Sequence, residues 1–238
     1  MDQGLALLDE SQRLAEQAQF TAPLSFLQLI RAWVYADLGD RESAVIMLDN
    51  LRMPDISMSL FDKFNEIRLF YRCYFAGQSE KAKAILNEIG EAIMSGTLEL
   101  YYGPLIYAVV TDVLLACGDF VQAMSLAETY LTRLRSNQVY LCVPDLLHDK
   151  GRALLGLGRR EEAYAAFLEA YREAHTQNSR RNLYPILADL AELESDPVRA
   201  AAYRQEGLKV TAFIAGTISE PGLKAAFLNL PAVRNLRN

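Results

Sequence analysis

The stretch GRALLGLGRREEAYAAFLEAYREA, residues 151–174, decides the fold of this chain. It contains a small residue, Gly151, a second glycine seven positions later, Gly158, and an alanine five positions after that, Ala163. The same spacing recurs as Ala32–Gly39–Ala44, Phe70–Gly77–Ala82, Thr111–Gly118–Ala123 and Ala188–Ser195–Ala200. The middle residues of the five instances are 38, 41, 40 and 37 positions apart. A fixed period in this range predicts an array of helical hairpins.

Each position of this signature has a structural role. The middle glycine suits the left-handed backbone conformation that ends helix A of a hairpin. The alanine lies in the first turns of helix B, where a small side chain lets the two helices approach closely. We expect the small first residue, two turns back on helix A, to form the facing half of that contact. The stripe Ala163, Phe167, Ala170 and Tyr171 has the periodicity of an amphipathic helix.

The pattern predicts an all-α chain with no competing strand signal. The expected A helices span 22–38, 57–76, 99–117, 141–157 and 181–194, and the expected B helices span 41–52, 79–95, 120–136, 160–176 and 197–215. Ser219-Glu220-Pro221 predicts the start of a last helix that runs to about Leu228, followed by Pro231 as a stop and a basic tail, Arg234–Arg237. We therefore predict a right-handed α-solenoid of about five hairpins that forms one domain over residues 1–238. It consists of an unpaired N-terminal helix (1–20), five helix pairs (22–215) and a capping helix with its tail (219–238).

The N-terminal segment, residues 4–11, has the character of a B helix whose A helix is missing. One explanation is that the chain is cut from a longer polypeptide. The alternative is a native start with one unpaired capping helix.

Composition limits the classes of partner and the compartment. The chain has 24 basic and 30 acidic residues, a net charge of −6, which argues against a nucleic-acid footprint and disfavours an anionic membrane surface. Cys73, Cys117 and Cys142 have no CxxC spacing and fall in apolar helical stretches, which is typical of reduced thiols in a cytoplasmic protein. The N-terminus lacks the basic region of a signal peptide, and the longest apolar stretch, Tyr101 to Cys117, is too interrupted for a membrane span.

Residues 151–174 resemble the tetratricopeptide repeat at Gly151, Leu154, Gly158, Ala163, Phe167 and Ala170. The other four instances are degenerate, and their spacing near 40 exceeds the tetratricopeptide period of about 34. Longer, looser repeats of this kind are similar to the C-terminal helical-repeat regions of large bacterial signalling and transcription-regulating ATPases of the maltose-regulator (MalT) type. The closing segment, residues 218–236, also looks like the end of such regions. Phe70 and Arg204 depart from the pattern. The resemblance implies a sensor or scaffold segment that acts on an ATPase encoded upstream, and it does not imply that this chain hydrolyses anything.

In arrays of this type the inner surface is lined by the helix-A positions 13, 10, 6 and 3 residues before the turn. These positions are aromatic or apolar in the first two repeats and polar in the fourth and fifth. The aromatic group has two readings, a packed core or a groove for an amphipathic helix or extended peptide. The candidate partner-binding residues in this half are Trp33, Phe64, Ile67, Tyr71 and Tyr74.

The polar half contributes the candidates Asp112, Asp145, His148 and Arg152. Asp145, His148 and Arg152 share one helix face. They form either a stripe of solvated or ion-paired groups or a weak ligand contact. A metal site is disfavoured because His175 lies in a different helix and no H-E-x-x-H spacing occurs. A carboxylate clamp of the chaperone-tail type is also disfavoured, because repeats one to three offer no Lys or Asn at these positions.

No phosphate loop, nucleophile elbow or dinucleotide fingerprint occurs, so we expect no cofactor and no enzyme activity. We therefore expect a protein-interaction scaffold that binds a protein or peptide on the concave face, or a neighbouring ATPase domain of the same polypeptide. The alternative is a sensor that binds a metabolite inside the superhelix and shifts an equilibrium between assemblies.

Overall fold

The computed structural model describes residues 1–19, 21–51, 64–94 and 105–237, and within these ranges every element is a helix. The all-α solenoid of helical hairpins predicted from the sequence is confirmed, because sequence-adjacent helices pack in pairs. Contacts between Cα atoms divide the chain into two compact units, residues 1–98 with 215–227 and residues 99–214 with 228–238. Whether the whole chain behaves as one domain stays a prediction. None of the helices in the described ranges has the length and apolar character required to cross a bilayer.

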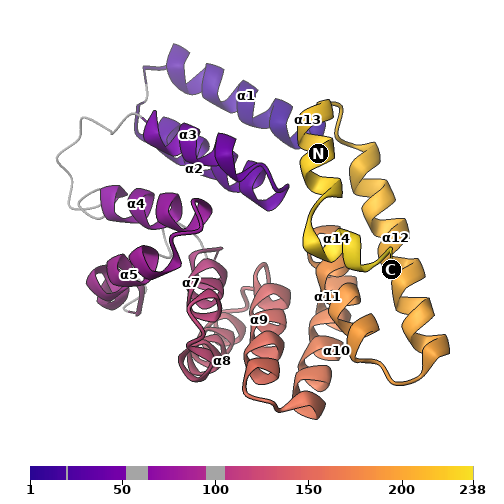
Figure 1. Ribbon diagram of the computed structural model, residues 1–238. Helices are drawn as coiled ribbons and strands as arrows, with labels where there is room; N and C mark the ends of the chain where they lie inside the picture. The colour runs from indigo at the N-terminus through magenta and orange to yellow at the C-terminus, as the bar shows by residue number, and fades with distance from the viewer. Residues whose placement is uncertain (20, 52–63, 95–104, 238) are drawn as a thin grey trace. The chain divides into compact units, whose positions relative to one another are not determined.

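The N-terminal unit contains two hairpins, α2 with α3 and α4 with α5, and α3 packs on α4 (Figure 1). The first helix, α1, packs on α2. A late segment of the chain that includes α13 belongs to the same unit. The helices are α1 (Asp2–Gln17), α2 (Thr21–Asp37), α3 (Arg41–Asp49), α4 (Phe64–Phe75), α5 (Ser79–Met94) and α13 (Pro221–Leu228). The expected start of the second A helix, at residue 57, lies outside the described residues.

Hydrogen bonds join the beginning of α1 to the segment before α13. The backbone N–H of Asp2 donates to the Thr217 carbonyl at 3.0 Å, and the Asp2 carboxylate accepts from the Ser219 hydroxyl at 2.5 Å. These bonds lower the pKa of Asp2, the Ser219 hydroxyl having the largest effect. Two segments that lie 217 positions apart in sequence are thus fastened within one unit.

The C-terminal unit contains the hairpins α7 with α8 and α9 with α10, and it continues with α11, α12 and α14 (Figure 1). Helix α10 packs on α11, and α14 also packs on α11. The helices are α7 (Leu105–Ala116), α8 (Phe120–Ser136), α9 (Val143–Gly156), α10 (Arg160–Thr176), α11 (Arg180–Leu193), α12 (Pro197–Gly216) and α14 (Pro231–Asn235). The expected start of the third A helix, at residue 99, lies outside the described residues, and the bounds of α8 to α12 lie close to those predicted from the sequence.

In four of the five repeats, a glycine forms the turn between helix A and helix B. Gly39, Gly77, Gly118 and Gly158 have φ angles of 90°, 70°, 77° and 75°, a region that L side chains rarely adopt. At Gly158 the next N–H, that of Arg159, donates to the Leu154 carbonyl at 2.9 Å and closes the helix in a Schellman arrangement.

The turn at Ser195 is built differently, which explains why glycine is dispensable there. Ser195 is not among the residues with positive φ, and Glu194 before it is extended (φ −67°, ψ 127°). The Glu194 carboxylate accepts from the N–H of Asp196 at 3.0 Å, and the Asp196 carboxylate accepts from the N–H of Val198 at 2.9 Å. Side chains therefore satisfy the backbone donors at this turn.

A close contact between helices A and B is present at Gly151. A methyl group added there would overlap the ring of Phe167, so Phe167, one turn beyond Ala163, packs directly on Gly151. All five signature alanines are buried (Ala44, Ala82, Ala123, Ala163 and Ala200). Phe70, the one large residue at the first position, is also fully buried.

The expected last helix ends at Leu228, before Pro231, as predicted, but a further short helix that was not predicted from the sequence follows it. Pro231 begins α14, because its fixed φ and missing N–H suit the first position of a helix. The expected basic tail is therefore helical in part, and it buries Val233 and Leu236. Leu236 lies against Gly207 of α12, where an added methyl group would approach it to 2.5 Å.

Candidate functional site

The polar residues predicted on the A helices come together in the C-terminal unit. We use the name polar ladder for a set of eight side chains on α7, α9 and α11. Helix α9 supplies the middle of the set, because its polar residues recur one helical turn apart and so share a face. The members of the polar ladder are Thr111, Asp112, Asp145, His148, Asp149, Arg152, Arg181 and Asp189.

One end of the polar ladder joins α7 to α9. The Arg152 guanidinium donates to Asp112 at 2.5 Å and to Asp149 at 3.2 Å. The second oxygen of Asp149 accepts from the Thr111 hydroxyl at 2.6 Å. Two carboxylates from different helices thus share one guanidinium.

Asp149 is the buried acid of the polar ladder, with 6% of its surface exposed. Burial, together with the negative charge of Asp112, raises its pKa to about 7. The charge of Arg152, the hydrogen bond from Thr111 and the proximity of His148 oppose this rise. For Arg152, desolvation acts to lower the pKa, and the charges of Asp112 and Asp149 outweigh it so that the pKa is raised.

The other end of the polar ladder joins α9 to α11. His148 Nε2 lies 2.6 Å from an Asp189 carboxylate oxygen, and Arg181 donates to Asp145 at 2.5 Å. The His148 ring also contacts Phe167, with 5.4 Å between the ring centroids. The second carboxylate oxygen of Asp145 is buried and accepts no hydrogen bond from any described residue. Three successive A helices are therefore linked by charged side chains.

The aromatic candidates lie in the N-terminal unit, and burial separates them into two groups. Phe64 and Ile67 are fully buried and Tyr71 is 3% exposed, which favours the packed-core reading for these three. Trp33 and Tyr74 are partly exposed. The guanidinium of Arg41 lies 5.6 Å from the centre of the Tyr74 ring.

Sequence reasoning found Asp112, Asp145, His148 and Arg152 and missed the buried Asp149. Asp149 stands one position beside the predicted inner face, so the periodicity did not select it. One residue in the sequence could have pointed to a buried polar partner such as Asp149. This residue is Thr111, which places a hydroxyl group at the first signature position of the third repeat. Only the contact between helices shows that this hydroxyl meets Asp149.

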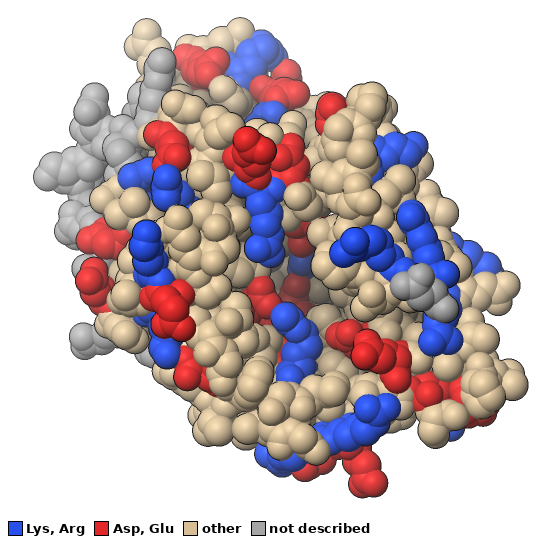
Figure 2. Space-filling view, viewed as in Figure 1, with Lys and Arg blue, Asp and Glu red and all other residues tan. Residues whose placement is uncertain are grey.

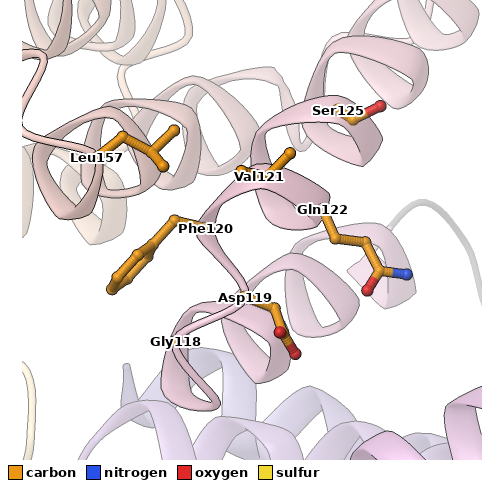
Figure 3. Close-up of a pocket in the computed structure, with 7 residues that line it drawn as sticks. All are labelled: Gly118, Asp119, Phe120, Val121, Gln122, Ser125 and Leu157. Carbon is orange, nitrogen blue, oxygen red and sulfur yellow. The ribbon is translucent and has the colours of Figure 1, made fainter.

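A hollow in the described part of the C-terminal unit lies apart from the polar ladder. The hollow shown in Figure 3 lies beside the first turn of α8, with Phe120 and Leu157 on one side and Asp119 and Gln122 on the other. None of its lining residues belongs to the polar ladder. The raised pKa of Asp149 is explained by burial and by the neighbouring charge of Asp112, and a perturbed pKa by itself does not indicate catalysis.

A metal-binding cluster of three or more His, Cys, Asp or Glu is absent from the described residues. The three cysteines are free thiols; Cys73 and Cys142 are buried and Cys117 is partly exposed. Burial, aided by the charge of Asp145, raises the pKa of the Cys142 thiol. A thiol held protonated in this way is a poor nucleophile and metal ligand.

Comparison with known families supports a repeat of the tetratricopeptide type. Residues 144–169 match the sequence model of the tetratricopeptide repeat family. The match covers most of α9 and the first part of α10, which contain the hairpin quoted at the outset. No curated protein shows significant sequence similarity to the chain. The chain thus contains a tetratricopeptide-like repeat region.

Proposed function

We propose that this chain is a non-catalytic interaction scaffold that binds a partner protein through the polar ladder of its C-terminal unit. Tetratricopeptide repeats generally mediate protein–protein interaction, and the matched repeat supplies Asp145, His148 and Arg152. The observation that carries the proposal is the gathering of these residues with Asp112 and Asp189 on three successive A helices.

The charge of the polar ladder specifies the chemistry of the partner. Its members include four aspartates, two arginines and one histidine, so the acids exceed the permanent cations. The side chains of Asp112 and Asp189 are 23% and 33% exposed, which leaves oxygen atoms within reach of solvent. A partner segment with Lys or Arg complements this excess. Complementary charges of this kind contribute mainly to specificity and to the rate of association.

The face of the molecule drawn in Figure 2 does not present one sign of charge. Figure 2 shows acidic and basic side chains interspersed over the face in view. This pattern supports a protein partner over nucleic acid or an anionic membrane, both of which require a basic patch.

The resemblance to MalT-type regulators supplies the wider context of the proposal. In that context the chain acts as the repeat region of a cytoplasmic bacterial signalling or transcription-regulating ATPase and contacts a neighbouring domain or a separate partner. Trp33 and Tyr74, which are partly exposed in the N-terminal unit, are then further contact residues.

A selection from a random peptide library tests the proposal. Peptides that bind the wild-type chain are expected to be enriched in Lys and Arg, and to lose at least tenfold in affinity for the double variant Asp112→Asn, Asp189→Asn. Glu169→Gln is the matched control, because Glu169 is an exposed acid that pairs with Arg135 outside the polar ladder. Equal binding to the double variant, or peptides without basic residues, would overturn the proposal.

A further inference from the structure

A second hollow in the C-terminal unit lies apart from the polar ladder. It has a volume of about 330 Å³ and is lined by residues of α11, α12 and α14. Its lining residues are Ala188, Ala191, Glu192, Arg204 and Asn235.

Arg204 is anomalous in the repeat. It stands four positions after the signature alanine of the fifth hairpin, where the other hairpins have buried apolar residues, among them Leu48, Leu86 and Phe167. Arg204 is partly buried, and it forms no hydrogen bond or ion pair with any residue that the structure describes. A guanidinium has five N–H donors, and leaving them without acceptors in a partly buried position costs free energy.

Glu192 supplies the opposite charge in the same hollow. It projects from α11, is exposed, and also has no hydrogen bond or ion pair among the described residues. Arg204 and Glu192 therefore lie farther apart than the 4.0 Å of an ion pair, although both line one cavity. The amide of Asn235 adds a neutral group that can donate and accept hydrogen bonds.

The walls of the hollow leave room between these polar groups. Ala188 and Ala191 are small and 5% and 4% exposed, so the α11 wall is apolar and lies close to the helix backbone. On α12, Gly207 is already covered by Leu236 of the C-terminal segment, which limits the hollow on that side. The nearest acid of the polar ladder on α11, Asp189, is engaged with His148 and is not a lining residue.

We propose that this hollow binds a free α-amino acid, a use distinct from the scaffold function of the polar ladder. The carboxylate of the amino acid accepts two parallel hydrogen bonds from Arg204 and a further one from the amide of Asn235. The ammonium group donates to Glu192, and the side chain lies over Ala188 and Ala191. A guanidinium favours carboxylates because the two groups can pair through two hydrogen bonds at once. The ligand thus bridges two charges that do not reach each other.

The test is a titration of the full chain with small molecules. Binding is monitored by calorimetry and by the NMR signals of the Asn235 side-chain amide. The probes are the twenty common amino acids, with propionate as the carboxylate-only control and propylamine as the amine-only control. We expect at least one amino acid to bind with a Kd on the order of 1 mM or lower. We expect Arg204→Gln to weaken that binding at least tenfold. Glu192→Gln should weaken the binding of the amino acid and leave the affinity for propionate unchanged.

Arg199→Gln is the matched control for a lost guanidinium, since Arg199 lies on α12 and pairs with Glu194 and Asp196. Thermal unfolding by circular dichroism confirms that each variant is folded before the titrations are compared. The proposal is overturned if no amino acid binds the wild-type chain, or if Arg204→Gln binds as well as the wild type does. It is also overturned if propionate binds as tightly as the amino acid.

Discussion

The two units use the same helix-A positions with opposite chemistry. The positions 13 and 10 residues before the turn glycine are Phe64 and Ile67 on α4 of the N-terminal unit, and both are fully buried. On α9 of the C-terminal unit they are Asp145 and His148, which are joined to α11 by charged contacts. One unit therefore packs an A helix with apolar side chains, and the other links its A helices through ion pairs.

This difference separates the residues that form a hairpin from the residues that give it a function. The signature alanines are buried in both units, as Ala82 and Ala163 show with no exposed surface. The A-helix face differs between the units because the spacing of the signature does not specify which residues occupy it. A binding function is accordingly expected where the face departs from apolar packing.

Among the variants that test this difference between the units, Phe64→Ala is expected to lose the most stability. Phe64 is fully buried and lies 5.6 Å, edge to face, from Phe26 of α2. Truncation of such a ring leaves a cavity, so we expect the free energy of unfolding to fall by about 3–5 kcal/mol. Urea denaturation measures the loss, and hydrogen exchange shows whether it falls on the N-terminal unit. The matched variant Asp145→Asn is expected to lose much less, and equal losses would contradict the comparison.

A loss of stability as the pH rises towards 7 is expected from Asp149 in the C-terminal unit. The pKa of Asp149 is raised to about 7 in the folded protein, by burial and then by Asp112, against about 3.9 for an unperturbed aspartate. Between these values the folded chain keeps a proton that the unfolded chain has lost. The contribution of Asp149 is therefore complete below about pH 4 and is lost as the pH rises through 7, by at most about 1.4 kcal/mol per pH unit.

The difference in the free energy of unfolding between wild type and Asp149→Asn, measured by urea denaturation from pH 4 to pH 8, isolates the contribution of Asp149. Asp112→Asn should narrow the pH range over which this stability is lost, because removal of the Asp112 charge lowers the pKa of Asp149. The equivalent position on α4 is Arg68, which donates to the Leu48 carbonyl at 2.9 Å, so no buried acid contributes from there. A difference that stays constant with pH would show that Asp149 is ionised throughout.

The sequence was a good guide to the hairpins because the hairpin signal is local. A glycine at a turn and an alanine five positions later constrain the backbone and the helix contact within one repeat. Helix bounds such as 120–136 and 160–176 could therefore be predicted to the residue.

The candidate site was less accessible because its partners come from different repeats. Arg152 meets Asp112 across 40 positions, and Thr111 meets Asp149 across 38. Which side of the A-helix face is buried depends on how successive hairpins stack, and the signature does not encode that angle. The same limit applies to the aromatic group, where periodicity could not distinguish the buried Phe64 from the partly exposed Trp33.

A smaller effect, common to both units, is expected from Ala163→Leu. Ala163 has no exposed surface and lies one turn before Phe167, whose ring fills the space over Gly151. Insertion of three carbon atoms overpacks this contact and is expected to cost about 1–3 kcal/mol. Ala82→Leu in the N-terminal unit should cost a similar amount, as thermal or urea denaturation would show. Wild-type stability in either variant would contradict the shared role of the signature alanine.

The smallest loss of stability is expected from substitutions in the turns between helices A and B of the two units. Gly158 and Gly77 have φ angles of 75° and 70°, and a methyl group added to either would have no atom within 4 Å. Alanine at these positions therefore carries only the backbone strain of the left-handed conformation, about 1–2 kcal/mol, partly offset by the lower entropy of the unfolded chain. Gly158→Ala and Gly77→Ala should thus lose about 1 kcal/mol each, in both units alike. Ser195 lacks a positive φ, so Ser195→Ala should show no such strain in the same denaturation series. A loss there as large as that of Gly158→Ala would mean that the side-chain bonds of Glu194 and Asp196 do not replace the glycine turn.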